Sequence, residues 1–103
     1  MTYLDPYSAA CDREIAAVRK AKPTTAAEVV SILREHDPQT DFIDGDAFWS
    51  PAGFGGDPLL PLLTAAGWAV QMREADYHWR ARHPDSGDTI EYVEGDVYAN
   101  PAA

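Results

Sequence analysis

The chain has 103 residues, with 17 acidic against 8 basic side chains and a formal net charge of −9 at neutral pH. A chain of this length suits one domain, so residues 1–103 are expected to share a single hydrophobic core. The charge opposes direct binding to nucleic acid, because phosphate contacts depend on Lys and Arg, and it favours a basic or oppositely patterned protein partner.

Cysteine usage and hydropathy indicate a cytoplasmic protein. Cys11 is the single cysteine, which excludes an internal disulfide, and no His or Cys near it has zinc-site spacing. The N-terminal residues lack the basic and apolar regions of a secretory signal. No apolar run approaches the roughly 18 residues that a membrane span requires. We therefore expect no membrane contact, and no pattern indicates a cofactor.

The first predicted helix covers residues 6–22. Asp5 can cap it, and Pro6 suits its first position, where a missing N–H costs nothing. Basic side chains gather before Pro23, at the helix end where the dipole favours positive charge. One apolar stripe follows from the helical spacing of Tyr7, Cys11, Ile15 and Val18.

A second helix is predicted at residues 26–36. Thr25 and Glu28 form the capping box that marks a helix start, and Pro38 ends the segment. Its apolar face consists of Ala26, Val29, Val30 and Leu33. Residues 39–56 then mix glycine, proline and aspartate with aromatics, which predicts an ordered loop with a short hairpin.

A third helix is predicted to start at Asp57 and Pro58 and to stop at Gly67. From Trp68 the apolar period changes to two, and "EAD" and "HPDSGD" supply turns between strands. The residues expected to face the helices are Trp68, Val70, Met72, Tyr77, Trp79, Ala81, Ile90 and Tyr92. Val97 and Tyr98 can add a short fourth strand.

These elements predict an α+β fold. Two or three N-terminal and central helices pack on a C-terminal three- to four-stranded antiparallel sheet, whose other face is polar.

A near-repeat links "FIDGDAF" at residues 42–48 to "YVEGDVY" at residues 92–98. Asp44-Gly45 and Glu94-Gly95 suit type I′ turns, which need positive φ at both central residues, so two turns of one kind is the favoured interpretation. The alternative is a cation site, because carboxylates are hard-cation ligands. Its candidate ligands are Asp44, Asp46, Glu94 and Asp96, with Asp41 and Glu91 nearby.

Basic side chains alternate along the middle strand. His78, Arg80 and Arg82 are expected to face Glu91 and Thr89 across the ladder. A solvated face with compensated charges is favoured over a binding patch, yet this strip is the best candidate for an anion site.

Other chemical signatures are weak. The glycines of "GFGGDP" precede a helix, but Asp57 and Pro58 oppose anion binding there. The three histidines form no ligand pair, and neither a G-x-S-x-G nor a Cys/His catalytic signature occurs. The sequence therefore leans against an enzyme.

The run "AAGWAVQMREADYHWRARHPDSGDTIEYVEGDVY" resembles the C-terminal part of small uncharacterised acidic proteins of actinobacteria and their bacteriophages. The resemblance covers about the last third of the chain. It is carried by Gly67, Trp68, Tyr77, Trp79, Gly87, Asp88 and residues 92–98. It implies an accessory gene product acting in the bacterial cytoplasm, and it transfers no catalytic residue.

Our leading hypothesis from the sequence is a small acidic interaction protein, phage-derived, that binds and modulates a host protein. Surplus aromatics in an acidic loop suggest its contact residues: Phe48, Trp49, Phe54, Asp41, Asp44 and Asp46. Closing the core is a nearly equal explanation for these aromatics. Two alternatives stay open: a DNA mimic that inhibits a nucleic-acid-binding protein, and a cation-binding protein or metal-dependent enzyme that uses the acidic turns. The sequence leaves the oligomeric state open.

Overall fold

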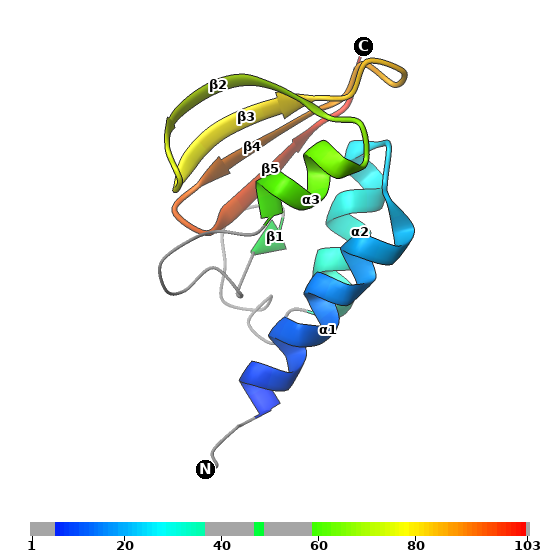
Figure 1. Ribbon diagram of the computed structural model, residues 1–103, viewed down its shortest axis with the longest axis vertical. Helices are drawn as coiled ribbons and strands as arrows, with labels where there is room; N and C mark the ends of the chain where they lie inside the picture. Colours follow the sequence, from blue (N-terminus) through cyan, green and yellow to red (C-terminus); the bar gives the residue numbers. More distant parts are fainter. Residues whose placement is uncertain (1–5, 37–46, 49–58, 103) are drawn as a thin grey trace.

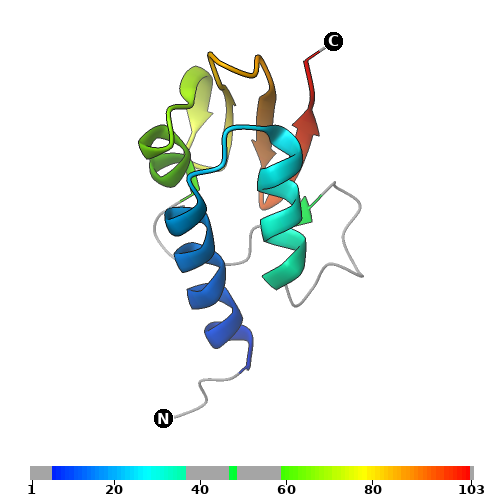
Figure 2. The same cartoon turned by 90° about the vertical axis from the view of Figure 1, so that its right-hand side faces the viewer.

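The computed structural model describes residues 6–36, 47–48 and 59–102. In that part of the chain, three helices lie on one side of a curved antiparallel sheet (Figure 1). A quarter turn of the molecule brings the helices in front of the strands, so the two layers are distinct (Figure 2). The predicted α+β fold with a C-terminal sheet is confirmed.

The first two helices pack against each other and contribute apolar side chains to the core. Helix α1 spans Pro6–Ala21 and buries Val18 completely. Helix α2 spans Ala26–His36 and turns Ala26, Val29 and Leu33 into the core. Both helices have the predicted bounds to within one residue.

The start of α2 is fixed by the predicted capping box. The Glu28 backbone N–H donates to the Thr25 hydroxyl at 3.2 Å, and the Thr25 N–H donates to the Glu28 carboxylate at 3.2 Å. A third bond from the Thr24 N–H reaches the same carboxylate at 3.0 Å. These bonds hold the pKa of Glu28 below its usual value, with the Thr24 bond as the largest cause.

The third helix, α3, spans Leu59–Ala65, and its last turn closes at Gly67, the predicted stop. Its predicted start at Asp57 and Pro58 lies outside the described residues. Gly67 has a φ of 101°, and its N–H donates to the Thr64 carbonyl while the Trp68 N–H donates to the Leu63 carbonyl. This pair of bonds is a Schellman ending, which requires the left-handed backbone that glycine adopts without strain. A Cβ at Gly67 would also lie 3.0 Å from the His83 Nε2 atom.

Four strands form the predicted meander. They are β2 (Ala69–Ala75), β3 (His78–Arg82), β4 (Thr89–Val93) and β5 (Asp96–Asn100). A short strand β1, Ala47–Phe48, pairs antiparallel with β5, so the described sheet has the order β1-β5-β4-β3-β2. The possible strand at Val97 and Tyr98 is therefore present as β5.

The inner face of the sheet follows the predicted alternation in its centre. Trp79 and Ala81 on β3, and Ile90 and Tyr92 on β4, are buried against the helices. The Trp79 and Tyr92 rings stack with centroids 5.2 Å apart. Aromatic stacking of this kind adds to the free energy gained by burying the rings.

The same alternation was wrong for β2. Val70 is 47 % exposed rather than buried, and Tyr77 lies 60 % exposed at the turn. The pairing of β2 with β3 shifts register between Val70 and Met72 and again between Arg73 and Ala75. Such bulges insert an extra residue and break the period of two, which the sequence pattern assumes. Only Trp68, just before the strand, is buried as expected.

Residues 83–88 connect β3 to β4 and tie the two layers together. The Asp88 carboxylate accepts the Ala26 N–H at the start of α2 and the Ala102 N–H, each at 2.8 Å. Ser86 donates its hydroxyl to the Thr24 carbonyl at 2.7 Å. The backbone bonds, first from Ala102 and then from Ala26, lower the pKa of Asp88, with the charge of His83 as a smaller cause.

His83 completes this junction from a buried position. Its Nε2 lies 3.1 Å from the Ala66 carbonyl oxygen, and its Nδ1 accepts the Asp85 N–H at 3.1 Å. Because a carbonyl only accepts, Nε2 is the donor in the bond to Ala66. Trp68 packs edge-on against this ring and donates its Nε1–H to the Pro23 carbonyl at 2.8 Å. The junction thus fixes α2 and α3 against one end of the sheet.

Candidate functional site

One face of the sheet points away from the helices and is not covered by any other described element of regular structure (Figure 1). The strand register places Met72, Arg80, Glu91 and Tyr98 in one row across it. We call this surface the outer sheet face. Its side chains are Ala69, Met72, Ala75, His78, Arg80, Arg82, Thr89, Glu91, Val93, Asp96, Tyr98 and Asn100.

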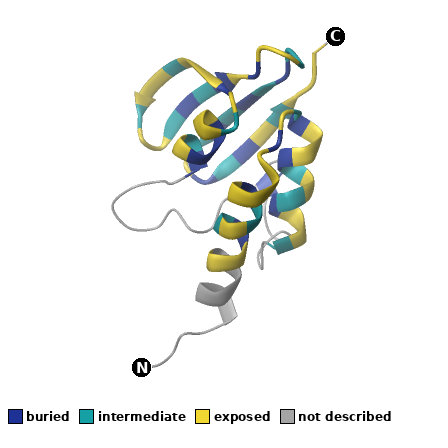
Figure 3. Ribbon diagram, turned by 45° about the vertical axis from the view of Figure 1, so that its right-hand side comes forward, coloured by how far each residue is buried: buried dark blue, intermediate teal, exposed yellow. Residues whose placement is uncertain are grey.

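Burial distinguishes this face from its reverse. Along β3 and β4 the buried residues alternate with half-buried or exposed ones, as the banded colouring of the strands shows (Figure 3). None of the described helices lies against the outer side (Figure 1). Tyr98, at 36 % exposure, is one of the large apolar side chains left at the surface.

The predicted strip of His78, Arg80 and Arg82 lies on this outer sheet face. Arg80 pairs with Glu91 and Arg82 pairs with Thr89 in the register of β3 with β4, as the sequence predicted. Whether the strip binds an anion stays a prediction.

The charges on the outer sheet face are divided between its two ends. His78 lies between two carboxylates, with Nδ1 2.9 Å from Glu74 and Nε2 3.6 Å from Glu91. Among the described residues, neither Arg80 nor Arg82 forms a salt bridge. The Arg82 guanidinium reaches toward Gly87, where an added Cβ would lie 3.5 Å from its Nη2. The row of Arg82 carries a cation and no carboxylate, whereas the row of His78 holds Asp96 and contacts Glu74. We call these rows the basic end and the acidic end of the face; Asp85 and Asp88 belong to the loop beside the basic end.

The edge strand β2 borders this face but is poorly suited to pairing with another strand. Two register shifts interrupt it, and Arg73 forms a surface salt bridge with Asp76. Bulges and charges on an edge strand oppose the regular hydrogen bonding that a further strand would need. Alternation alone could not reveal these bulges, because the sequence keeps its apolar period through Val70 and Met72.

The second copy of the repeat forms the predicted turn. Glu94 and Gly95 have φ values of 50° and 98°, and the flanking Val93 and Asp96 pair with each other. Positive φ at both central residues is the signature of a type I′ hairpin turn. The first copy meets the second through strand pairing, since Ala47 lies opposite Val97 and Phe48 opposite Asp96.

The structure describes few of the other predicted site residues. Asp41, Asp44, Asp46, Trp49 and Phe54 lie outside the described residues, and of Phe48 only the backbone in β1 is described. The aromatic contact site and the cation site therefore stay predictions. Across residues 6–36, 47–48 and 59–102, no three His, Cys, Asp or Glu side chains group as metal ligands.

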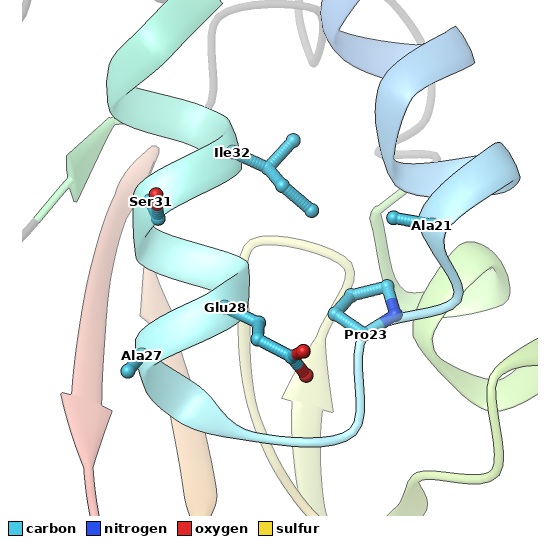
Figure 4. Close-up of a pocket in the computed structure, with 6 residues that line it drawn as sticks. All are labelled: Ala21, Pro23, Ala27, Glu28, Ser31 and Ile32. Atoms are coloured by element: carbon cyan, nitrogen blue, oxygen red, sulfur yellow. The ribbon is translucent and has the colours of Figure 1, made fainter.

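A shallow groove between the end of α1 and α2 was not anticipated from the sequence. It has a volume of about 320 Å³ and is mostly apolar (Figure 4). Its walls are formed by Ala21, Pro23, Ala27, Glu28, Ser31 and Ile32. The sequence signal that could have predicted this groove is the pair of small side chains Ala27 and Ser31, four positions apart on α2. The Glu28 carboxylate beside it already accepts the two N–H groups of the helix cap.

Comparisons of the chain with protein-family models, with curated proteins and with solved structures gave no match. In the described part of the chain, no helix is both long and apolar enough to cross a membrane.

Proposed function

We propose that this protein is a small interaction module and that the outer sheet face is the surface with which it binds a partner protein. The observation that carries the proposal is the row formed by Met72, Arg80, Glu91 and Tyr98 on a face that no described helix covers. Arg, Tyr and Met are the residue types that protein interfaces favour, and Arg and Tyr recur among the residues that dominate binding energy.

The net charge supports a particular kind of partner. At −9 the molecule attracts proteins of opposite charge over long distances, which raises association rates and suppresses acidic competitors. The resemblance of residues 65–98 to small proteins of actinobacteria and their bacteriophages favours a host protein of the bacterial cytoplasm as that partner. In this role the module modulates its target by occupying a surface.

Affinity capture with charge-reversed variants tests this function. The tagged protein is incubated with an actinobacterial lysate at low and high salt, and the bound proteins are quantified by mass spectrometry. The test variant is Arg80→Glu with Arg82→Glu. The matched control is Arg13→Glu with Arg19→Glu, which makes the same change in net charge at exposed positions of α1.

A partner that is retained by the control and lost by the test variant supports the proposal. A partner retained equally by both variants excludes the outer sheet face as the binding surface. A partner that both variants bind at least as strongly as the wild type at low salt, and that high salt releases, points to bulk negative charge and hence to the DNA-mimic alternative.

A further inference from the structure

The distribution of charge on the outer sheet face specifies what kind of segment it can recognise. In the row at its basic end, Arg82 lies between Ala69 and Thr89, with Asn100 beyond, so no carboxylate shares that row. Two rows away, His78 lies beside Val93 and Asp96 and contacts Glu74. The two rows lie four strand positions apart, or about 13 Å.

The basic end offers donors that suit a carboxylate. The Arg82 guanidinium presents a planar fork of N–H groups, which pairs with a carboxylate through two parallel bonds. The Thr89 hydroxyl is directly opposite Arg82, and the Asn100 amide follows in the same row. Arg80 lies one row further along the strand and shares its row with Glu91, so its charge is partly compensated.

The spacing of the two arginines equals that of alternate residues in any extended chain. Same-side residues of a strand are two positions, or about 6.6 Å, apart. An extended segment lying along β3 therefore places one acidic side chain over Arg82 and the next same-side acidic side chain over Arg80. The following same-side position lies over His78, which contacts the Glu74 and Glu91 carboxylates. A cation is favoured there, and a third carboxylate is repelled.

From this charge order we infer that the outer sheet face recognises an extended segment of a partner protein with the pattern acid-x-acid-x-base. The inference rests on the proposed function and adds the chemistry of the partner. The net charge of −9 sharpens the selection, because a longer acidic run is repelled by the rest of the molecule.

Two blocked peptides of identical composition test the pattern. The matching peptide is acetyl-Thr-Glu-Thr-Glu-Thr-Lys-Thr-amide, and the scrambled control is acetyl-Thr-Glu-Thr-Lys-Thr-Glu-Thr-amide. Each is titrated into the ¹⁵N-labelled full chain while amide chemical shifts are followed by NMR. We expect saturable shifts at Arg80, Arg82 and Thr89 with the matching peptide, and about tenfold weaker binding of the scrambled one.

Variants assign the effect to the two arginines. Arg80→Gln with Arg82→Gln is expected to abolish the difference between the peptides, whereas Arg13→Gln with Arg19→Gln is expected to preserve it. The NMR spectrum of each variant shows in the same experiment whether the fold is intact. Inorganic phosphate is titrated as a third ligand.

Equal affinity for the two peptides, absence of binding, or phosphate binding as strong as that of the matching peptide would each overturn the inferred pattern. The proposed function as an interaction module is still supported after such a result if lysate capture depends on Arg80 and Arg82. If capture does not depend on them, the proposed surface is wrong and the inferred pattern falls with it.

Discussion

The two faces of the central strands behave as separate parts of the molecule although their residues alternate in the chain. Trp79 is completely buried on β3, while its neighbour Arg80 points to the outer sheet face. Tyr92 is buried on β4 beside Glu91, which contacts His78 on the outer side. Core packing and the proposed recognition therefore fall on alternate positions, and substitutions can test each without the other.

The largest loss of stability is expected from a substitution on the inner face of the sheet. Trp79→Ala removes a fully buried ring that stacks on Tyr92, so we expect a loss of about 3–5 kcal/mol in the free energy of unfolding. Urea denaturation followed by circular dichroism measures it. A loss below about 1 kcal/mol would contradict the assignment of Trp79 to the core.

A smaller effect on stability is expected when each of the two buried tryptophans is replaced by Phe. Trp68 donates its Nε1–H to the Pro23 carbonyl, whereas in the described part of the chain the Trp79 Nε1–H has no acceptor. Trp68→Phe leaves that carbonyl unpaired, while Trp79→Phe removes a donor that was already unpaired. We expect Trp68→Phe to be the more destabilising by about 1 kcal/mol.

Urea midpoints of the two Phe variants, determined side by side, make the comparison. Equal losses of stability would show that the lost side-chain volume alone sets the cost of each substitution, and that the hydrogen bond from Trp68 to Pro23 adds nothing to stability.

The junction at residues 83–88 gives a pH-dependent effect. The pKa of Asp88 is lower in the folded chain than its ordinary value of 3.8, so its carboxylate stabilises the fold above that value. This contribution is lost as pH falls through the folded-state pKa. Asp88→Asn is expected to lower the melting temperature at neutral pH and to flatten its decline on acidification.

Melting curves of the wild type and Asp88→Asn from about pH 6 to about pH 3 test this expectation. Glu28→Gln serves as a comparison, because the pKa of Glu28 is also lowered, by local helix-cap bonds. Parallel curves for the wild type and Asp88→Asn would show that Asp88 does not link folding to protons.

The smallest stability effect is expected on the outer sheet face. Arg80→Gln with Arg82→Gln removes two guanidinium groups that form no salt bridge within the described residues. We expect the free energy of unfolding to change by less than about 0.5 kcal/mol. The same variant is expected to lose the captured partner. A large stability loss would place these arginines in the structural part of the sheet and remove the contrast between its faces.

Local signals in the sequence were reliable where neighbouring residues decide the outcome. The Thr25 and Glu28 cap, the Gly67 helix ending and the Glu94-Gly95 turn all formed as predicted. Each depends on hydrogen bonds or dihedral angles within a few residues. The interactions that decide the conformation are therefore all present in a short stretch of sequence. The alternation on β3 and β4 succeeded because both strands are central and have one covered face.

The candidate site was predicted only in part. His78, Arg80 and Arg82 were identified as one strip, and their register with Glu91 and Thr89 was correct. The continuation of that strip into a row with Met72 and Tyr98 was not, because it depends on the bulges of β2 and on the pairing of β5. The helix groove at Ala27 and Ser31 likewise requires two packed helices.

The sequence by itself determined the α+β order of elements, the ends of α1 and α2, the two turns that contain Gly67 and Gly95, and the charge of the chain. The tertiary structure alone decided that Asp88 would reach the N-terminus of α2, 62 positions away, and that β1 would pair with β5. It also decided that the pairing of β2 would shift in register and leave Val70 exposed. Such contacts join residues far apart in the chain, and only the packing of the whole core selects among the many pairings that local patterns allow.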